Sequence, residues 1–156
     1  MKKFDLEEVK TFIDNEGPKS KVYLGCDSVS YKKHGKWWAD FYLVIVVHKN
    51  GCNGCRIFGE VVTEPDYNTN KKKPTYRLMM EAYKVSDLYL KLADVLKKRP
   101  VEVHLDLNPD KKYASSLVIE QAIGYIKGTC NIVPLVKPDA WAATHAADRL
   151  LRVKIA

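Results

Sequence analysis

The order of apolar segments along the chain is the feature that most constrains its fold. Runs with the composition and alternation of strands occur at 21–28, 37–48, 56–63, 101–107 and 130–136. Runs with the apolar spacing of helices occur at 75–98, 115–127 and 138–152. Strands joined by short turns pair antiparallel, whereas strand–helix–strand connections join parallel strands. The order therefore predicts an α/β fold with a mixed five-stranded sheet, three strands antiparallel and two parallel crossover strands, flanked by helices.

The first 17 residues are expected to add a helix in front of this core. In residues 5–16, Leu6, Val9 and Ile13 recur on one helical face, and Asp5 and Glu8 have the spacing of a capping box. The chain has 156 residues, the size of one ordinary domain. We therefore expect a single domain over residues 1–156, with the added helix in 1–17 and the core fold in 20–152.

The composition excludes some classes of protein and favours one class of partner. Hydrophobic residues make up 46% of the chain and charged residues 29%, a globular balance that excludes a wholly disordered chain. No run approaches the roughly 18 apolar residues of a membrane-spanning helix, and the N-terminal residues lack the apolar core of a signal peptide. We therefore expect a cytoplasmic protein with no membrane partner. The 26 Lys and Arg exceed the 19 Asp and Glu, and the net charge of +7 favours nucleic acid as a partner.

Two aspartates lie in strand-like segments, where Asp is disfavoured. Asp27 lies near the end of the first strand, and Gly25 leaves space beside it on the same face. Asp106 shares one face of its strand with Glu102 and His104, although a crossover strand is usually covered on both faces. Simpler interpretations are that Asp27 caps a turn and that Asp106 lies on an edge strand with one wet face.

Two further acids lie on helix faces expected to point toward the sheet. Glu81 occupies the step between Leu78 and Val85 in the apolar stripe of the long helix, so its carboxylate needs a partner inside the fold. Asp148 shares a face of the last helix with His145, among small alanines that allow close packing. The alternatives are a salt bridge from Glu81 to a basic residue of the sheet, and a solvent-facing polar pair for His145 and Asp148.

Together the four acids predict a metal site. In a sheet of this order the strands of Asp27 and Asp106 are neighbours, and the helices of Glu81 and Asp148 can pack over their ends. Four close carboxylates would repel one another unless cations bind them, and oxygen ligands select hard ions such as Mg²⁺ or Mn²⁺. Two such ions are the usual apparatus for phosphodiester cleavage. Asp139 is a rival fourth ligand, although an acid near a helix start also suits the helix dipole.

The motifs around these acids resemble a known family. Residues 24–28 (LGCDS), 103–108 (VHLDLN), 137–143 (KPDAWAA) and 147–148 (AD) are similar to the YkuK-like branch of the ribonuclease-H-like predicted nucleases. The resemblance covers roughly residues 20–152 and implies a ribonuclease-H-like fold and a metal-dependent nuclease. The metal ligands that it implies are Asp27, Glu81, Asp106 and Asp148. It also implies that His145, which resembles the last-helix histidine of some Holliday-junction resolvases, assists proton transfer or orients water.

Basic and aromatic residues in expected loops are the candidate substrate contacts: Lys32, Lys33, Trp37, Lys72, Lys73 and Lys111. The first three lie beside a polar turn expected at 30–35, whose tip could hold phosphates and stack on bases. The other three flank the segments that bear Glu81 and Asp106, so they could reach phosphates near the acids. The simpler interpretation is solvated loops, with Trp37 or Trp38 in the core.

Other functions remain open at this point. The same fold without catalysis would be a nucleic-acid-binding module, with salt-dependent affinity and no requirement for Mg²⁺ or Mn²⁺. The spacing of Cys52 and Cys55 could bind zinc or act in redox chemistry, although the turn residues around them favour a hairpin loop. Cys26 and Cys130 are expected to be small buried residues. An RNA–DNA hybrid and branched or duplex DNA are equally open as substrates, and so is a homodimer, which would suit symmetric junctions.

Overall fold

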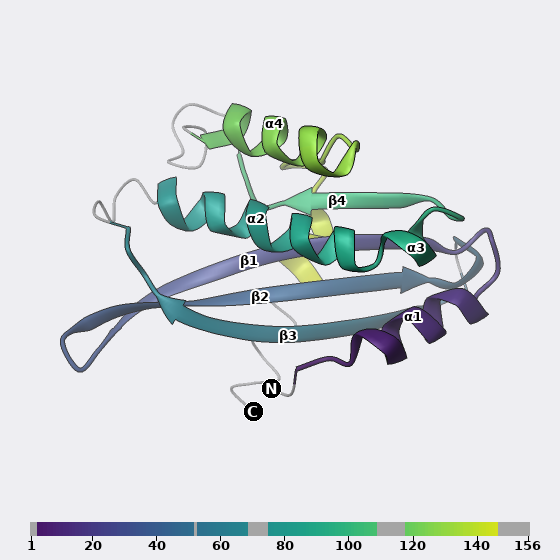
Figure 1. The fold of residues 1–156 in the computed structure, drawn as a ribbon, viewed down its shortest axis with the longest axis horizontal. Coiled ribbons are helices and arrows are strands. Elements are labelled where there is room, and N and C mark those ends of the chain that lie inside the picture. The colour runs from purple at the N-terminus through teal and green to yellow at the C-terminus, as the bar shows by residue number, and fades with distance from the viewer. Residues whose placement is uncertain (1–2, 52, 69–74, 109–117, 147–156) are drawn as a thin grey trace.

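A four-stranded sheet of order β3-β2-β1-β4 forms the centre of the computed structural model, which describes residues 3–51, 53–68, 75–108 and 118–146 (Figure 1). The strands are β1 (Lys21–Lys33), β2 (Lys36–His48), β3 (Cys55–Pro65) and β4 (Val101–Leu105). β2 pairs antiparallel with both β1 and β3, and β4 pairs parallel with β1. The structure therefore has the mixed α/β architecture predicted from the order of the segments.

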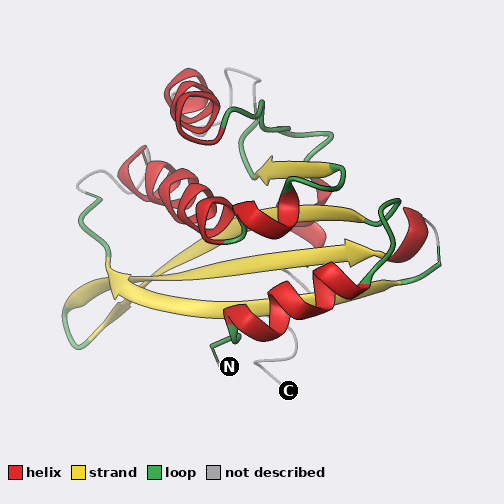
Figure 2. Ribbon diagram, turned by 45° about the vertical axis from the view of Figure 1, so that its right-hand side comes forward, coloured by secondary structure: helices red, strands yellow, loops and turns green. Residues whose placement is uncertain are grey.

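Helices cover both faces of this sheet. On one face lie α1 (Leu6–Asn15), α2 (Thr75–Lys91), the short α3 (Ala93–Leu96) and α4 (Ile119–Cys130), and on the other lies η3 (Ala142–Ala146) (Figures 1 and 2). A single 3-10 turn, η1 (Lys49–Gly51), joins β2 to the loop before β3. Asp5 caps α1 as predicted, accepting from the amide of Glu7 at 2.9 Å. None of the helices within the described ranges is long and apolar enough to cross a membrane.

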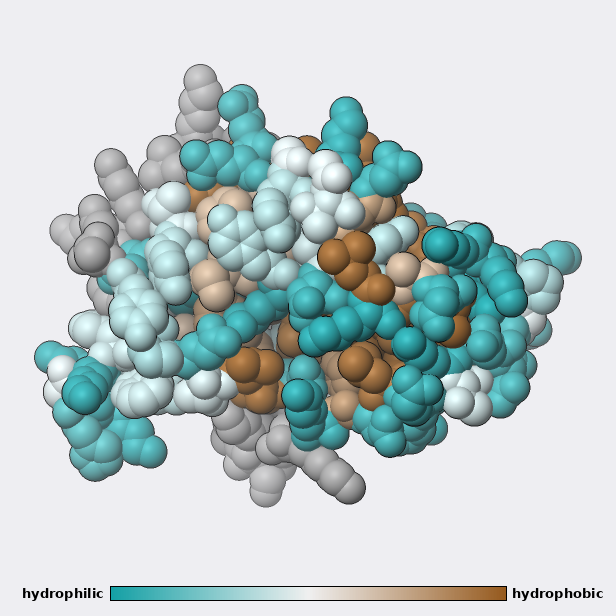
Figure 3. All heavy atoms as spheres, viewed as in Figure 1, coloured by the Kyte–Doolittle hydropathy of each residue, from teal (hydrophilic) through white to brown (hydrophobic). Residues whose placement is uncertain are grey.

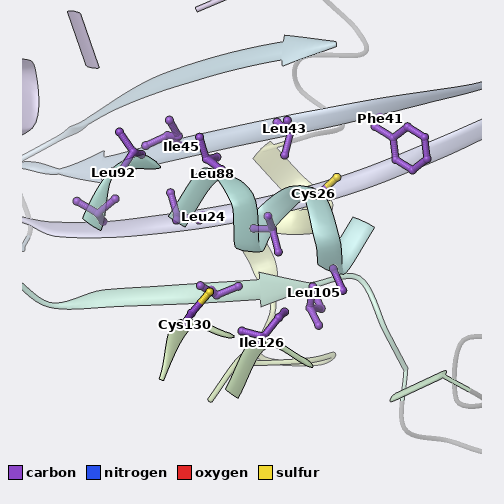
Figure 4. Packing of buried hydrophobic residues seen from close by; sticks show 14 of the residues in the cluster. Leu24, Cys26, Phe41, Leu43, Ile45, Leu88, Leu92, Leu105, Ile126 and Cys130 are labelled. Atoms are coloured by element: carbon purple, nitrogen blue, oxygen red, sulfur yellow. The ribbon is translucent and has the colours of Figure 1, made fainter. Parts of the chain in front are cut away.

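The main core lies between the sheet and the α1–α4 face. Because side chains alternate along a strand, Leu24 of β1 and Leu43 and Ile45 of β2 point to this face, where they meet Leu88 of α2 and Leu92 (Figure 4). All five are buried, and burying one such side chain contributes about 1.5–3 kcal/mol. The core therefore fixes α2, and with it the acid that α2 carries, over β1.

The expected fifth strand at 130–136 is wrong, because the sheet has four strands. Only Leu135 forms a bridge to this edge, in parallel with His104 of β4. Its amide donates to the Val103 carbonyl at 2.8 Å. Pro134 and Pro138 lie on either side, and proline has no amide hydrogen with which to extend a ladder. The segment therefore runs beside β4 without becoming a strand.

The expected ends of two helices also differ. The helix expected at 115–127 continues through Gly128, because α4 ends at Cys130. Asn131 ends the helix instead, in the left-handed conformation at φ 55°. The long helix predicted at 75–98 is two helices, because the chain departs from helical geometry at Leu92, between α2 and α3.

The β1–β2 hairpin is longer than predicted. Residues 30–35 were expected to form a polar turn, but β1 continues to Lys33 and the loop is only His34 and Gly35. Both loop residues have positive φ, 50° and 77°, as in the type I′ turn that matches the twist of a hairpin. Since β4 ends its pairing at Cys26 and β3 at Trp38, the last residues of the hairpin project beyond the sheet (Figure 1).

Candidate functional site

Asp27 and Asp106 lie where two parallel strands part. The last β1–β4 pair joins Cys26 to Leu105, and each aspartate is the next residue of its chain segment. β4 ends there, so in the described part of the chain no strand pairs with β1 beyond this point on that edge, and Asp27 is partly exposed. The strand order predicted from the sequence thus brings these two carboxylates to one place.

Glu81 brings a third carboxylate to this place from α2. Its side chain is 1% exposed. Ser28, the neighbour of Asp27, donates its hydroxyl to Oε1 of Glu81, and Arg77 Nη1 lies 3.9 Å from the same oxygen. Arg77 Nη1 also donates to the Ser28 hydroxyl at 2.6 Å and to the Ser28 carbonyl at 2.9 Å. The interpretation of Glu81 as an inward-pointing acid is therefore correct, and its basic neighbour comes from its own helix.

The environment of the Glu81 carboxylate disfavours its ionised form. Oε2 is buried and has no hydrogen-bond partner among the residues that the structure describes. Burial raises the pKa of Glu81 well above its ordinary value, and the charges of Asp27 and Asp106 raise it further, against the opposing effects of Ser28 and Arg77. Burial and two neighbouring carboxylates therefore disfavour the ionised form of Glu81.

Lys137 is the cation that faces this cluster. Its Nζ lies 2.6 Å from Oδ1 of Asp106, and this hydrogen bond raises the pKa of Lys137, with further contributions from Asp27 and Glu81. The sequence analysis did not single out Lys137. Lys137 is the first residue of the KPDAWAA motif, in which Asp139, the rival ligand predicted from the sequence, is exposed. The signal that the sequence offered was the position of Lys137 directly after the segment 130–136, which was expected to be a strand.

Some features of this site suit a divalent cation and others oppose it. The buried Oε2 of Glu81 and the mutual repulsion of the carboxylates suit a bound cation. The ammonium of Lys137 already holds Asp106, and within the described part of the chain no three His, Cys, Asp or Glu side chains form a group that could hold one metal ion. Asp148, the fourth predicted ligand, lies outside the described residues. Carboxylate oxygens are the donors that Mg²⁺ and Mn²⁺ prefer, but in this arrangement Lys137 holds Asp106 and the three described acids do not converge on one ion.

His104 anchors the helical segment on the other face of the sheet. It is fully buried; the Ala142 amide donates to its Nδ1 at 3.0 Å, and its Nε2 lies 2.9 Å from Glu102 Oε2. Because Nδ1 accepts, Nε2 carries the proton in this arrangement. Lys21 donates in turn to Glu102. The alternative that this face of the strand is exposed to water is therefore wrong at His104.

Aromatic packing completes that anchor. The Trp141 ring lies 4.6 Å from Tyr23 and 5.5 Å from His104, measured between centroids. His145, the predicted helper, follows in η3 and is exposed. η3 is the only part of the predicted 138–152 helix that falls within the described residues as a helix.

The candidate substrate contacts divide by where they lie. Lys32, Lys33 and Trp37 are exposed on the projecting hairpin, and Trp37 is 40% exposed, so the alternative that placed this side chain in the core is wrong. Hydrophilic side chains cover the end of this hairpin, at the lower left of Figure 3. Lys72, Lys73 and Lys111 lie outside the described residues.

The cysteines give no second site within the described part of the chain. Cys26 and Cys130 are buried, as expected, and Cys55 is exposed at the start of β3. Cys52 lies outside the described residues. The turn interpretation of this region agrees with η1 and with Gly54, whose φ is 85°.

A comparison with known protein families covers nearly the whole chain. A family model described as Ribonuclease H-like matches residues 6–152. The match begins in α1 and includes Asp27, Glu81, Asp106 and Lys137. Comparison with curated proteins and with solved structures gives no match. The family match implies a function related to nucleic acid.

Proposed function

The chain belongs to the ribonuclease H-like family, and from this premise we propose that it is a divalent-metal-dependent nuclease that hydrolyses phosphodiester bonds. The observation that carries the proposal is the carboxylate of Glu81, which is buried near Asp27 and Asp106 and has one oxygen to which no described residue donates a hydrogen bond. A fold tolerates such an arrangement at a cost in stability, and a bound cation would offset that cost.

Asp27, Glu81 and Asp106 are the residues that would hold the metal, with Asp148 as the predicted fourth ligand. Mg²⁺ or Mn²⁺, expected as two ions, would activate water and stabilise the leaving oxygen. Ser28 and Arg77 position Glu81 through their hydrogen bonds. Lys137, once off Asp106, is placed to contact a phosphate, and the net charge of +7 favours a polyanionic substrate.

The bond between Lys137 and Asp106 favours a second candidate function. If the ammonium remains on Asp106, the acid needs no metal, and the protein would be a nucleic-acid-binding module on the same fold. Such a module would bind nucleic acid with a strong dependence on salt, and neither binding nor any other activity would require a divalent ion.

A substrate panel separates the two functions. Labelled RNA–DNA hybrid, duplex DNA, single strands and a four-way junction are incubated with the protein in Mn²⁺ or in EDTA. The proposal expects cleavage of at least one substrate in Mn²⁺ and none in EDTA. Asp27→Asn and Asp106→Asn should abolish that cleavage with the fold retained by circular dichroism, whereas the exposed Asp94→Asn on α3 should cleave as wild type. Full Mn²⁺-dependent activity in Asp27→Asn, or binding without cleavage of any substrate, contradicts the proposal.

A further inference from the structure

A hollow of about 470 Å³ lies against the projecting β1–β2 hairpin. Its lining side chains are aromatic, basic or hydroxyl-bearing: Tyr31, Lys33, His34, Lys36, Trp38 and Thr63. None of these lining residues is acidic. We call this hollow the hairpin groove, and its composition is that of a surface for a flat ring beside an anion.

The strand register places the groove on one face of the hairpin. Tyr31 pairs with Trp38, and Lys33 pairs with Lys36, so these four side chains share a face. Successive residues of a strand point to opposite faces, and therefore the Lys32 and Trp37 pair lies on the back of the hairpin. Of the hairpin contacts predicted from the sequence, only Lys33 belongs to the groove.

A buried carboxylate holds the groove in shape. Asp40 is 8% exposed, and its Oδ1 accepts from the hydroxyl of Tyr31 at 3.2 Å and from that of Thr63 at 2.6 Å. These bonds fix one side chain of β1 and one of β3 around the Trp38 ring. A ligand would therefore find the aromatic surface already ordered, which lowers the entropic cost of binding.

The groove and Asp27 lie along the same face of β1. Asp27, Val29, Tyr31 and Lys33 are alternate residues of the strand and point to one side. Val29 is 41% exposed, so the strand face between the two sites is open. From Asp27 to Tyr31 the strand advances about 13 Å at about 3.3 Å per residue. That span equals about four nucleotides at the ~3.4 Å rise of a stacked strand.

We propose that the hairpin groove binds an unpaired strand of nucleic acid, with a base stacked on Trp38 and phosphates held by Lys33 and Lys36. The strand then runs along β1 toward Asp27. Aromatic side chains stack on bases that have been separated from their partners, so the groove selects unpaired over fully duplex nucleic acid. The inference rests on the proposed function for its choice of nucleic acid as ligand, but it concerns binding and not cleavage.

Fluorescence anisotropy of labelled single-stranded oligonucleotides tests the groove, with EDTA present so that cleavage cannot contribute. Trp38→Ala is expected to weaken binding about tenfold or more, whereas Trp38→Phe, which keeps an aromatic face, retains most of the affinity. The matched control on the back of the same hairpin, Lys32→Ala with Trp37→Ala, changes binding little. Melting curves confirm that each variant is folded.

Salt dependence tests the two groove lysines separately. Removing two phosphate contacts lowers the slope of log affinity against log salt by about 1.4 for a single strand. Lys33→Ala with Lys36→Ala is expected to show that loss. The exposed pair Lys97→Ala with Lys98→Ala, which removes the same charge elsewhere on the molecule, keeps the wild-type slope.

The outcomes distinguish this inference from the proposed function. Equal losses for the groove and back-face variants overturn the groove, as does equal affinity for duplex and single strand. Metal-dependent cleavage of a duplex by a protein with no affinity for single strands overturns the groove and leaves the nuclease. Groove-dependent binding of single strands without cleavage of any substrate supports the groove and overturns the nuclease.

Discussion

Lys137 donates through Nζ to Oδ1 of Asp106 at 2.6 Å, and this bond places an ammonium group against the carboxylates of Asp27 and Glu81. The fold thus carries its own monovalent counter-ion at the position where the family resemblance implies a divalent one. An ammonium group on Asp106 uses one lone pair of this carboxylate and repels a divalent cation bound to it, so the two should compete.

Removing the ammonium should therefore strengthen metal binding. Lys137→Ala is expected to tighten Mn²⁺ binding about fivefold, the equivalent of the roughly 1 kcal/mol that a partly exposed ion pair contributes. Titration calorimetry with MnCl₂ measures the change. Lys91→Ala, which breaks the exposed ion pair to Asp87 at 2.8 Å, is the control and should leave Mn²⁺ affinity unchanged. Unchanged or weaker binding in Lys137→Ala would show that this lysine does not compete with the ion.

The buried carboxyl of Glu81 should make stability fall as pH rises. Its folded pKa is raised, by burial first and then by Asp27, above the ordinary 4.5, so the folded state keeps a proton that the unfolded state releases. The stabilisation is complete below about pH 4.5 and declines toward the folded pKa, by up to about 1.4 kcal/mol per pH unit. Glu81→Gln has no such proton. Its free energy of unfolding relative to wild type, measured in urea with EDTA present, should increase with pH above 4.5, and a constant difference would contradict the assignment.

The sequence was sufficient to bring Asp27, Asp106 and Glu81 together. The order of hairpins and crossovers is enough to make β1 and β4, the strands of Asp27 and Asp106, neighbours, and helical spacing alone turns Glu81 inward. Lys137 could not be placed in the same way. Its contact depends on the path of the segment between Pro134 and Pro138, which follows β4 with one bridge and not with the alternation of a full strand.

In the β1–β2 hairpin, the sequence pattern predicts a turn where the structure has paired strands. Residues 30–36 are mostly polar, so composition predicts a turn, but the Tyr31–Trp38 pair and a two-residue turn continue the ladder to Lys33. Cross-strand pairing is a contact between distant positions, and it outweighs the low strand propensity of lysine. The hairpin groove could not be predicted from the sequence for this reason, because the hairpin has two distinct faces only where its strands are paired.

Two glycine substitutions test the corrected ends of these elements. Gly128 lies inside α4, and an added Cβ would meet no atom within 4 Å, so Gly128→Ala should stabilise the protein by about 0.5–1 kcal/mol. Gly35 has φ 77° in the hairpin turn, so Gly35→Ala should destabilise it by about 1–2 kcal/mol. Urea midpoints measure both. Had Gly128 ended the helix in a left-handed conformation, alanine there would also destabilise.

His104 should make stability fall as pH decreases, opposite in sign to Glu81. Burial lowers the folded pKa of His104 below the ordinary 6.5, against the opposing bond to Glu102, and the Ala142 amide aimed at Nδ1 leaves no acceptor for a second proton. The unfolded state binds that proton first, so the stabilisation is complete above about pH 6.5 and is lost as pH falls toward the folded pKa.

His104→Asn isolates this contribution, because its amide oxygen can still accept from Ala142 but the side chain does not titrate. The free energy of unfolding of wild type minus that of the variant should increase between pH 5 and about 6.5, by at most ~1.4 kcal/mol per unit, and then level off. Taking the difference at each pH removes the contribution of Glu81, which both proteins share. His34→Asn is the control: this exposed residue has φ 50°, a conformation that asparagine tolerates, and the variant should follow the wild-type pH dependence. If the stability of His104→Asn also follows the wild-type pH dependence, the interpretation that a neutral His104 ring holds η3 is wrong.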